Sequence, residues 1–187
     1  MKLILISGKA QHGKDSVARM LQATLIRRGR LVAISHYGDA VKFLADLFLD
    51  LGLPIDMFNE EKTLEQRQIL QDFGTELMRK RHPDYWIKHM ELQLVALKEL
   101  EYEYVIISDV RMHNEIFEMM ARYNVITVRV ERLEYTSKLS PEQQEHISET
   151  ALDDHIFDYT IRAKNGLINL VDQVEFFADK ISGGKNG

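Results

Sequence analysis

Hydrophobic positions along the chain follow two spacings in turn, short apolar runs and stripes with helical periodicity. The apolar runs predict buried strands, and they lie at residues 2–7, 31–35, 104–108, 125–130 and 159–161. The run YVIIS at 104–108 is the richest in β-branched residues, which predicts a strand in the middle of a sheet.

Stripes of apolar residues at helical spacing separate these runs. Val17, Leu21 and Leu25, for example, share one face of a helix expected from residue 13 to about residue 29. Further helices are expected at 39–51, 64–81, 84–100, 114–123 and 166–181. A break is expected at His82-Pro83 because proline disfavours helix in the residue that precedes it.

This alternation of strands and helices predicts an α/β domain with a parallel sheet covered on both faces. The length of 187 residues fits one domain, residues 1–187. Within it we expect a helical insertion at about 53–100, a lid at about 131–155 and a disordered tail at about 182–187.

Composition excludes several classes of protein. No apolar run approaches the ~18 residues of a membrane span, and we expect no membrane association. The sequence has no cysteine, which excludes disulfides and thiolate zinc sites and favours a cytoplasmic protein. The net charge of −5 argues against binding to nucleic acid, because duplex-binding domains usually carry a basic surplus.

The strongest chemical signal is GKAQHGKDS at residues 8–16, between an expected buried strand and an expected helix. Gly8 and Gly13 allow the backbone to curl so that successive N–H groups converge on one anion. The start of the helix adds partial positive charge, and Lys14 can reach the β- and γ-phosphates of a nucleotide. The segment therefore predicts a phosphate loop that binds ATP.

The residue after this lysine departs from the common phosphate-loop pattern. It is Asp15, where Ser or Thr is usual, and the hydroxyl comes one position later at Ser16. Adenylate-kinase-like loops share this shift, which points to a small-molecule kinase. Ser16 is therefore our first candidate ligand for Mg²⁺.

Two further strand ends carry charged residues, and parallel strand ends are where open α/β sheets bind ligands. Asp109 is a candidate Mg²⁺ ligand and Arg111 a candidate phosphate ligand. The alternative is that Asp109 caps the next helix and Arg111 forms a surface ion pair. Asp39, with Lys42 one turn later, is expected either to contact the acceptor or to cap its own helix.

The identity of the acceptor can be argued from the charges that it needs. A hydroxyl acceptor benefits from a base, whereas a phosphate acceptor needs cations that offset repulsion between the two phosphates. Arg79 lies in the expected insertion, one turn after Thr75 and Glu76, and the three residues can share a face. Trp86 can stack on a nucleobase or pack in the core.

At this point the sequence resembles a known family, the deoxynucleoside monophosphate kinases of phages and bacteria, a branch of the P-loop nucleotide kinases. The stretches that carry the likeness span nearly the whole chain: GKAQHGKDS, LQDFGTELMRKRHPDYW, ISDVRMHNE, HISETALDD and IRAKNG. Met112 and His113 stand where the family usually has Phe and Pro, and Ile147 stands where Pro is common.

The resemblance implies a three-layer P-loop kinase fold and ATP-dependent, Mg²⁺-assisted phosphorylation of a (deoxy)nucleoside monophosphate. It also implies that Arg132 and the motif His146–Glu149 lie in or beside the lid. With the residue chemistry above, it assigns the site by role. Catalytic residues are Lys14, Asp109, Arg111 and Arg132. ATP-binding residues are Gly8, His12, Gly13, Lys14, Asp15, Ser16, Asn165 and Gly166. Acceptor-binding residues are Asp39, Lys42, Gln71, Gly74, Thr75, Glu76, Arg79 and Trp86.

Two other functions fit the same residues. A dephospho-coenzyme A kinase shares the loop and transfers to a hydroxyl, for which Asp39 would act as base. A non-catalytic nucleotide-binding regulator would keep the fold without turnover. The resemblance does not carry over the base of the acceptor, and a homodimer remains open because dimers occur among relatives.

Overall fold

The computed structural model describes residues 1–49, 63–133, 135–163 and 168–183. A five-stranded sheet forms its centre, in the order β2-β3-β1-β4-β5, and every neighbouring pair runs parallel. The strands are β1 (Lys2–Ser7), β2 (Val32–Ser35), β3 (Tyr104–Val110), β4 (Asn124–Arg132) and β5 (Tyr159–Ala163). Each lies where an apolar run predicted it, and β3, β4 and β5 extend beyond their runs at the carboxyl end.

Helices join the strands, as the alternating pattern predicted. They are α1 (Lys14–Arg27), α2 (Tyr37–Leu49), α3 (Leu64–Gln71), α4 (Tyr85–Glu99), α5 (His113–Met120), α6 (Pro141–Glu145), α7 (Ile147–Thr150) and α8 (Ile168–Ser182). The expected helix at 64–81 changes to a π-helix, η2 (Asp72–Arg79), halfway along. The polar lid segment contains two short helices, and Ser140 caps the first of them.

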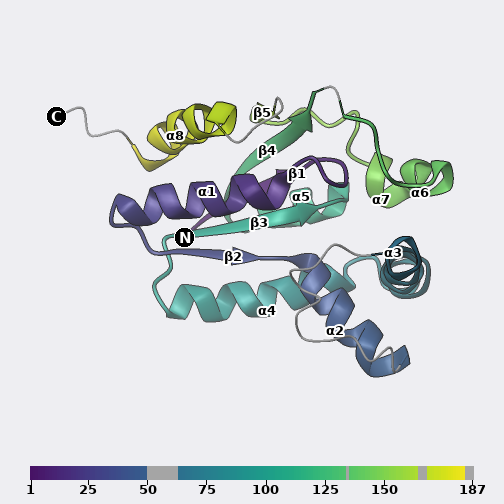
Figure 1. Ribbon diagram of the computed structural model, residues 1–187. Helices are drawn as coiled ribbons and strands as arrows, with labels where there is room; N and C mark the ends of the chain where they lie inside the picture. Colours follow the sequence, from purple (N-terminus) through teal and green to yellow (C-terminus); the bar gives the residue numbers. More distant parts are fainter. Residues whose placement is uncertain (50–62, 134, 164–167, 184–187) are drawn as a thin grey trace.

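The sheet separates two apolar cores, as the alternation of side chains along β1 requires. Ile4 and Ile6 face α1 and α8, whereas Leu3 and Leu5 face the layer that contains α2, α4 and α5. Figure 1 shows α1 and α8 on one side of the sheet and α2 and α4 on the other. This confirms the three-layer architecture with a central parallel sheet.

A close approach between α2 and η2 shapes part of the wall of a cleft that Val41 and Gly74 both line. A side chain at Gly74 would place its Cβ 3.0 Å from Val41, so glycine lets the two helices meet. The indole of Trp86, from α4, donates a hydrogen bond to the Gly74 carbonyl at 2.9 Å. The π-helix is thereby fixed to both neighbouring helices, and π-helical turns occur often at functional sites.

The parallel arrangement brings the carboxyl ends of β1, β2 and β3 to one edge of the sheet. The phosphate loop and the starts of α2 and α5 therefore meet there, as the strand-end rule predicts. Within the described ranges, none of the helices combines the length and apolar character that crossing a bilayer requires. Asn165, Gly166, residues 53–62 of the insertion and residues 184–187 of the tail lie outside the described residues.

Candidate active site

The phosphate loop has the curled backbone that its glycines predict. Gly8 and Gly13 have φ values of 153° and 90°, and Gln11 has a φ of 61°. A Cβ atom on Gly8 would lie 2.4 Å from the carbonyl oxygen of Val130, which leaves no space for a side chain. Glycine is therefore required at position 8 both by its backbone angle and by the contact with β4.

Lys14 folds back across this loop. Its Nζ donates hydrogen bonds to the carbonyl oxygens of Gly8 at 2.8 Å and Lys9 at 2.9 Å. The side chain is buried, and burial, with a smaller contribution from the Arg111 charge, lowers the pKa of Lys14 to about 7. A phosphate that accepted these N–H groups would restore the charge of the ammonium group, because a nearby anion favours the protonated form.

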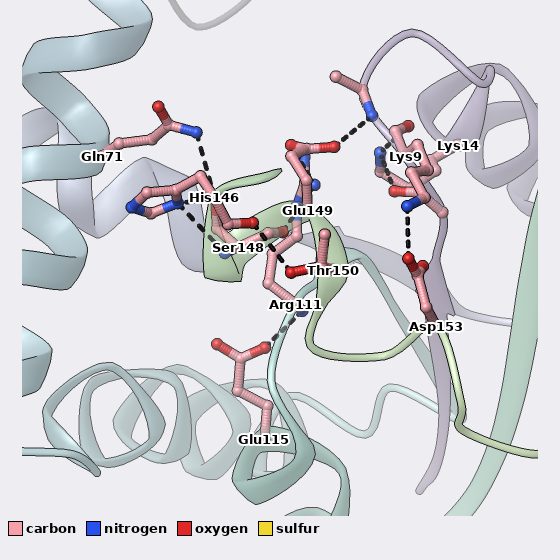
Figure 2. Close-up of polar contacts among 12 residues, drawn as sticks. Lys9, Lys14, Gln71, Arg111, Glu115, His146, Ser148, Glu149, Thr150 and Asp153 are labelled. Carbon is pink, nitrogen blue, oxygen red and sulfur yellow. Dashed lines mark hydrogen bonds and ion pairs between the residues drawn. The ribbon is translucent and has the colours of Figure 1, made fainter. Parts of the chain in front are cut away.

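Glu149, from α7, bridges the phosphate loop and Arg111 (Figure 2). Its carboxylate accepts the backbone N–H of Ala10 at 2.8 Å and the guanidinium of Arg111 at 2.5 Å. Arg111 also donates to the carbonyl oxygen of Ser148 at 3.0 Å. Arg111 thus points toward the loop as expected, but its partner is a buried carboxylate of the lid segment rather than a surface acid.

A second contact joins the same segment to the loop. Asp153 accepts from Lys9 at 2.5 Å and from Arg129 at 2.9 Å. The expected lid at 131–155 therefore contacts the phosphate loop through two carboxylates in this structure. The motif HISETALDD identified this segment in the sequence. Its contacts with the loop could not be predicted, because no spacing rule pairs residues 9 and 10 with residues 149 and 153.

Asp109 accepts two backbone N–H groups at the start of α2, from Tyr37 at 2.9 Å and from Gly38 at 2.6 Å. It is therefore a helix cap, although not of the helix that comes after it in the chain. Glu115 takes that role for α5, since it accepts the N–H groups of Arg111 and Met112 at 2.7 and 3.0 Å. The alternative interpretation, that Asp109 caps the next helix, is therefore wrong.

The strand ends fit an Mg²⁺ ion that is held mainly by phosphates. Across the described part of the chain, no three His, Cys, Asp or Glu side chains gather in a geometry that would hold a metal. Mg²⁺ usually takes one or two protein carboxylates and completes its shell with phosphates and water. Asp109 has lone pairs beyond its two backbone bonds, so it suits such a site. Ser16 is exposed in the first turn of α1.

A chain of alternating charges runs from the loop to α2, through a histidine that the sequence analysis did not select. Asp15 lies 3.7 Å from Nε2 of His36, Nδ1 of His36 lies 3.1 Å from Asp39, and Lys42 donates to Asp39 at 2.8 Å. Burial lowers the pKa of His36, but the nearby carboxylates of Asp15 and Asp39 outweigh burial and raise the pKa to about 10. His36 is therefore a cation at neutral pH.

Asp39 is held on two sides by these cations. Burial raises its pKa, but His36 and Lys42 outweigh burial and leave the pKa below the ordinary value. A carboxylate with a lowered pKa is a weak proton acceptor. The arrangement places Asp39 on the cleft wall, in an environment that does not suit a catalytic base.

Arg79, at the end of η2, faces the cleft with part of its guanidinium unused. Its Nη2 donates to the fully buried Glu115 at 2.7 Å. Its Nε and Nη1 are buried and have no hydrogen-bond partner among the residues that the structure describes. The Gln71 side chain donates to Ser148 at 3.3 Å, while its Oε1 is likewise unpaired within the described ranges.

One cleft of about 530 Å³ gathers most of the expected residues of both substrates. From the donor side it contains Lys14, Asp15, Asp109 and Arg111, and from the acceptor side Asp39, Lys42, Gln71, Gly74, Thr75, Arg79 and Trp86. Trp86 is 1% exposed, which fits the core-packing alternative better than stacking on a base.

Other candidates lie outside the cleft wall. Glu76 has a side chain 54% exposed and lies 3.8 Å from His146. The guanidinium of Arg132 lies over the ring of Tyr135 at 4.7 Å, and its backbone N–H donates to Nδ1 of His12 at 3.2 Å. His12 and Arg132 therefore form, with Tyr135, a cluster beside the loop.

Comparisons with known proteins give the family and the fold. A family model described as deoxynucleotide monophosphate kinase matches residues 52–174. Among solved structures, TT1252 from Thermus thermophilus is similar over 97% of this chain and 98% of its own, with 17% identity and a TM-score of 0.52. No curated protein matches the sequence significantly.

Two solved kinases are similar at lower TM-scores. The APS kinase CysC of Mycobacterium tuberculosis has a TM-score of 0.46 and 14% identity, over 97% of each chain. A sugar kinase from Janibacter sp. HTCC2649 has a TM-score of 0.49 and 10% identity, over 95% of this chain and 94% of its own. The family match covers well over half of the sequence, and the phosphate loop supplies the donor site of a kinase. The chain therefore belongs to the deoxynucleotide monophosphate kinase family and is a P-loop phosphotransferase.

Proposed function

We propose that the protein transfers the γ-phosphoryl group of ATP to the phosphate of a deoxynucleoside or ribonucleoside monophosphate. The observation that carries the proposal is the shared cleft, which is lined both by Lys14 of the loop and by Arg79, whose Nε and Nη1 have no hydrogen-bond partner among the described residues. A cation with unused donors on the acceptor side is what a phosphate acceptor requires.

On the donor side, Lys14 and the N–H groups of the loop bind the phosphates of ATP. Gly8 and Gly13 give the loop its curvature, and His12 with Arg132 flanks its outer side. Asn165 and Gly166 come after β5 in the sequence, and we keep them as the proposed contact with adenine. We propose that a donor bound there is attacked in line by the acceptor, and alignment supplies much of the rate in phosphoryl transfer.

Between the two substrates, Arg111 and Arg79 neutralise the charge on the transferred group and on the acceptor. Asp109 and Ser16 are the residues that would hold Mg²⁺, and the ion would offset the negative charge of the donor phosphates. Lys42, Thr75 and Gln71 complete the acceptor wall, while Glu76 would contact substrate only if the cleft closed. An acceptor phosphate is already an anion, so no residue has to remove a proton.

The hydroxyl-acceptor alternative needs Asp39 as a base. Because His36 and Lys42 hold the pKa of Asp39 below its ordinary value, this carboxylate is poorly suited to that role. The charges around Asp39 therefore favour a phosphate acceptor over dephospho-coenzyme A.

A coupled assay tests the proposal. ADP formation is measured with Mg·ATP and each common nucleoside and deoxynucleoside monophosphate, with dephospho-coenzyme A in parallel. We expect turnover with at least one monophosphate, no turnover with dephospho-coenzyme A, and a loss of at least about 10²-fold in kcat for Lys14→Ala. Turnover with dephospho-coenzyme A alone, or a Lys14→Ala variant at near-normal rate, would contradict the proposal.

A further inference from the structure

Three buried donor atoms of the cleft lack a hydrogen-bond partner among the described residues. Two are the Nε and Nη1 of Arg79, and the third is the hydroxyl of Tyr37, the first residue of α2. Both residues line the same cleft. Leaving a buried donor unpaired costs about 1–3 kcal/mol, so a cluster of them indicates a site shaped for a ligand that accepts hydrogen bonds.

Protein contacts fix both residues from behind. The backbone N–H of Tyr37 donates to Asp109 at 2.9 Å, and its ring packs in the core with 4% exposure. Arg79 is held by its Nη2 bond to Glu115 at 2.7 Å. The remaining donors are therefore preorganised, so little conformational entropy is lost when a ligand binds to them.

The charges around Tyr37 keep its hydroxyl protonated. Burial, and the nearby carboxylates Glu115 and Asp109, raise the pKa of Tyr37, while Arg79 lowers it by less. The hydroxyl is consequently protonated at neutral pH and can donate a hydrogen bond. It donates to an acceptor and cannot itself serve as a base.

We propose that the Tyr37 hydroxyl and the two unpaired N–H groups of Arg79 form one subsite for the phosphate of the acceptor nucleotide. The N–H groups of a guanidinium are strong donors to phosphate oxygens, and the Tyr37 hydroxyl supplies a further donor to the same anion. Tyr37 is thus a substrate-binding residue. The identity of the ligand as a nucleoside monophosphate rests on the proposed function. The binding of a phosphate at this subsite does not depend on that function.

The variant Tyr37→Phe tests this subsite because it removes the hydroxyl and keeps the ring. We expect the KM for the monophosphate to rise about tenfold, the size of one hydrogen bond to a charged group. The KM for ATP should stay unchanged. The melting temperature should not fall, because the hydroxyl has no hydrogen-bond partner within the described part of the protein.

Tyr104→Phe is the matched control. The Tyr104 hydroxyl is buried and donates to the carbonyl oxygen of Ile181 at 3.2 Å, in the core on the α8 side of the sheet. Its loss should lower the melting temperature by about 2–4 °C and leave both KM values unchanged. The two variants should therefore show opposite patterns, one in substrate binding and the other in stability.

Inorganic phosphate is the probe that separates the subsite from the reaction. Calorimetric titration should show phosphate binding to the wild type, weakened in Tyr37→Phe by the same factor as the KM. If the wild type phosphorylated no monophosphate, the proposed function would fail, and the phosphate titration would still decide the subsite. Equal phosphate affinity in wild type and Tyr37→Phe, or a loss of stability in Tyr37→Phe without an effect on binding, would overturn the proposal.

Discussion

The two ends of the cleft satisfy their polar groups in opposite ways. At the donor end, Lys14 is bonded to carbonyl oxygens of its own loop, and the Ala10 N–H and Arg111 share the carboxylate of Glu149. At the acceptor end, Tyr37 and Arg79 keep three donors that no described residue accepts. The donors of the first group are therefore paired with acceptors of the protein itself, whereas those of the second group can pair with acceptors of a ligand.

This difference predicts different binding behaviour for the two substrates. The phosphate oxygens of ATP must displace the carboxylate and carbonyl oxygens that already accept hydrogen bonds from the loop. Breaking those protein hydrogen bonds offsets part of the binding free energy of ATP. The acceptor phosphate replaces nothing from the described protein, so each new hydrogen bond contributes more fully. At the acceptor end, the unpaired buried donors instead lower the stability of the folded protein without ligand.

The largest expected effect in this comparison comes from a substitution at Arg79, because it removes hydrogen-bond donors from the acceptor end. Arg79→Lys keeps the charge but cannot serve Glu115 and a phosphate together. We expect kcat/KM for the monophosphate to fall about 10²-fold, with the KM for ATP unchanged in steady-state kinetics. Arg81→Lys, at an exposed position, is the control and should behave as the wild type. Equal losses for both substrates would show that the two ends are not independent.

The next largest effect comes from a substitution at Glu149, because it removes a charged acceptor from the donor end. Glu149→Gln removes the charge that pairs with Arg111 and should lower the free energy of unfolding by about 1–2 kcal/mol. Because ATP phosphates would no longer compete with a carboxylate, the rise in melting temperature on adding ATP should be larger than in the wild type. Thermal denaturation with and without ATP measures both quantities, and the exposed Glu145→Gln is the control. A smaller ATP-induced rise would show that Glu149 supports ATP binding rather than competing with it.

The smallest effect concerns His36, which lies between the two ends. Its folded pKa of about 10 exceeds the unfolded value of about 6.5. The stabilisation from Asp15 and Asp39 is therefore complete below about pH 6.5 and is lost as the pH rises toward 10. NMR titration should find the ring still protonated at pH 8, and Asp39→Asn should lower its pKa. A wild-type ring that titrated near pH 6.5 would refute the charge chain.

Topology accounts for the part of the site that could be predicted from the sequence. Lys14, Asp109 and Arg111 meet because parallel strands end at one edge, so a correct strand assignment also predicts their neighbourhood. The pairing of these groups was not predictable in the same way. Asp109 accepts from a residue 72 positions away and Glu149 from one 139 positions away, and pairing at that range depends on helix packing rather than on local pattern. His36 was missed because no metal-like spacing drew attention to it, although its place at a strand end beside Asp39 was a usable signal.

The two backbone bonds of Asp109 have a consequence for mutagenesis. Asparagine at this position would turn one acceptor oxygen into an NH₂ group directed at an N–H of α2, and the helix start would shift together with Tyr37. An inactive Asp109→Asn enzyme would thus combine damage to the proposed Mg²⁺ site with displacement of Tyr37 and the start of α2. Exchanging Mn²⁺ for Mg²⁺ in assays of the unmutated protein with sulfur-substituted nucleotides tests the proposed metal site without moving Tyr37 or α2.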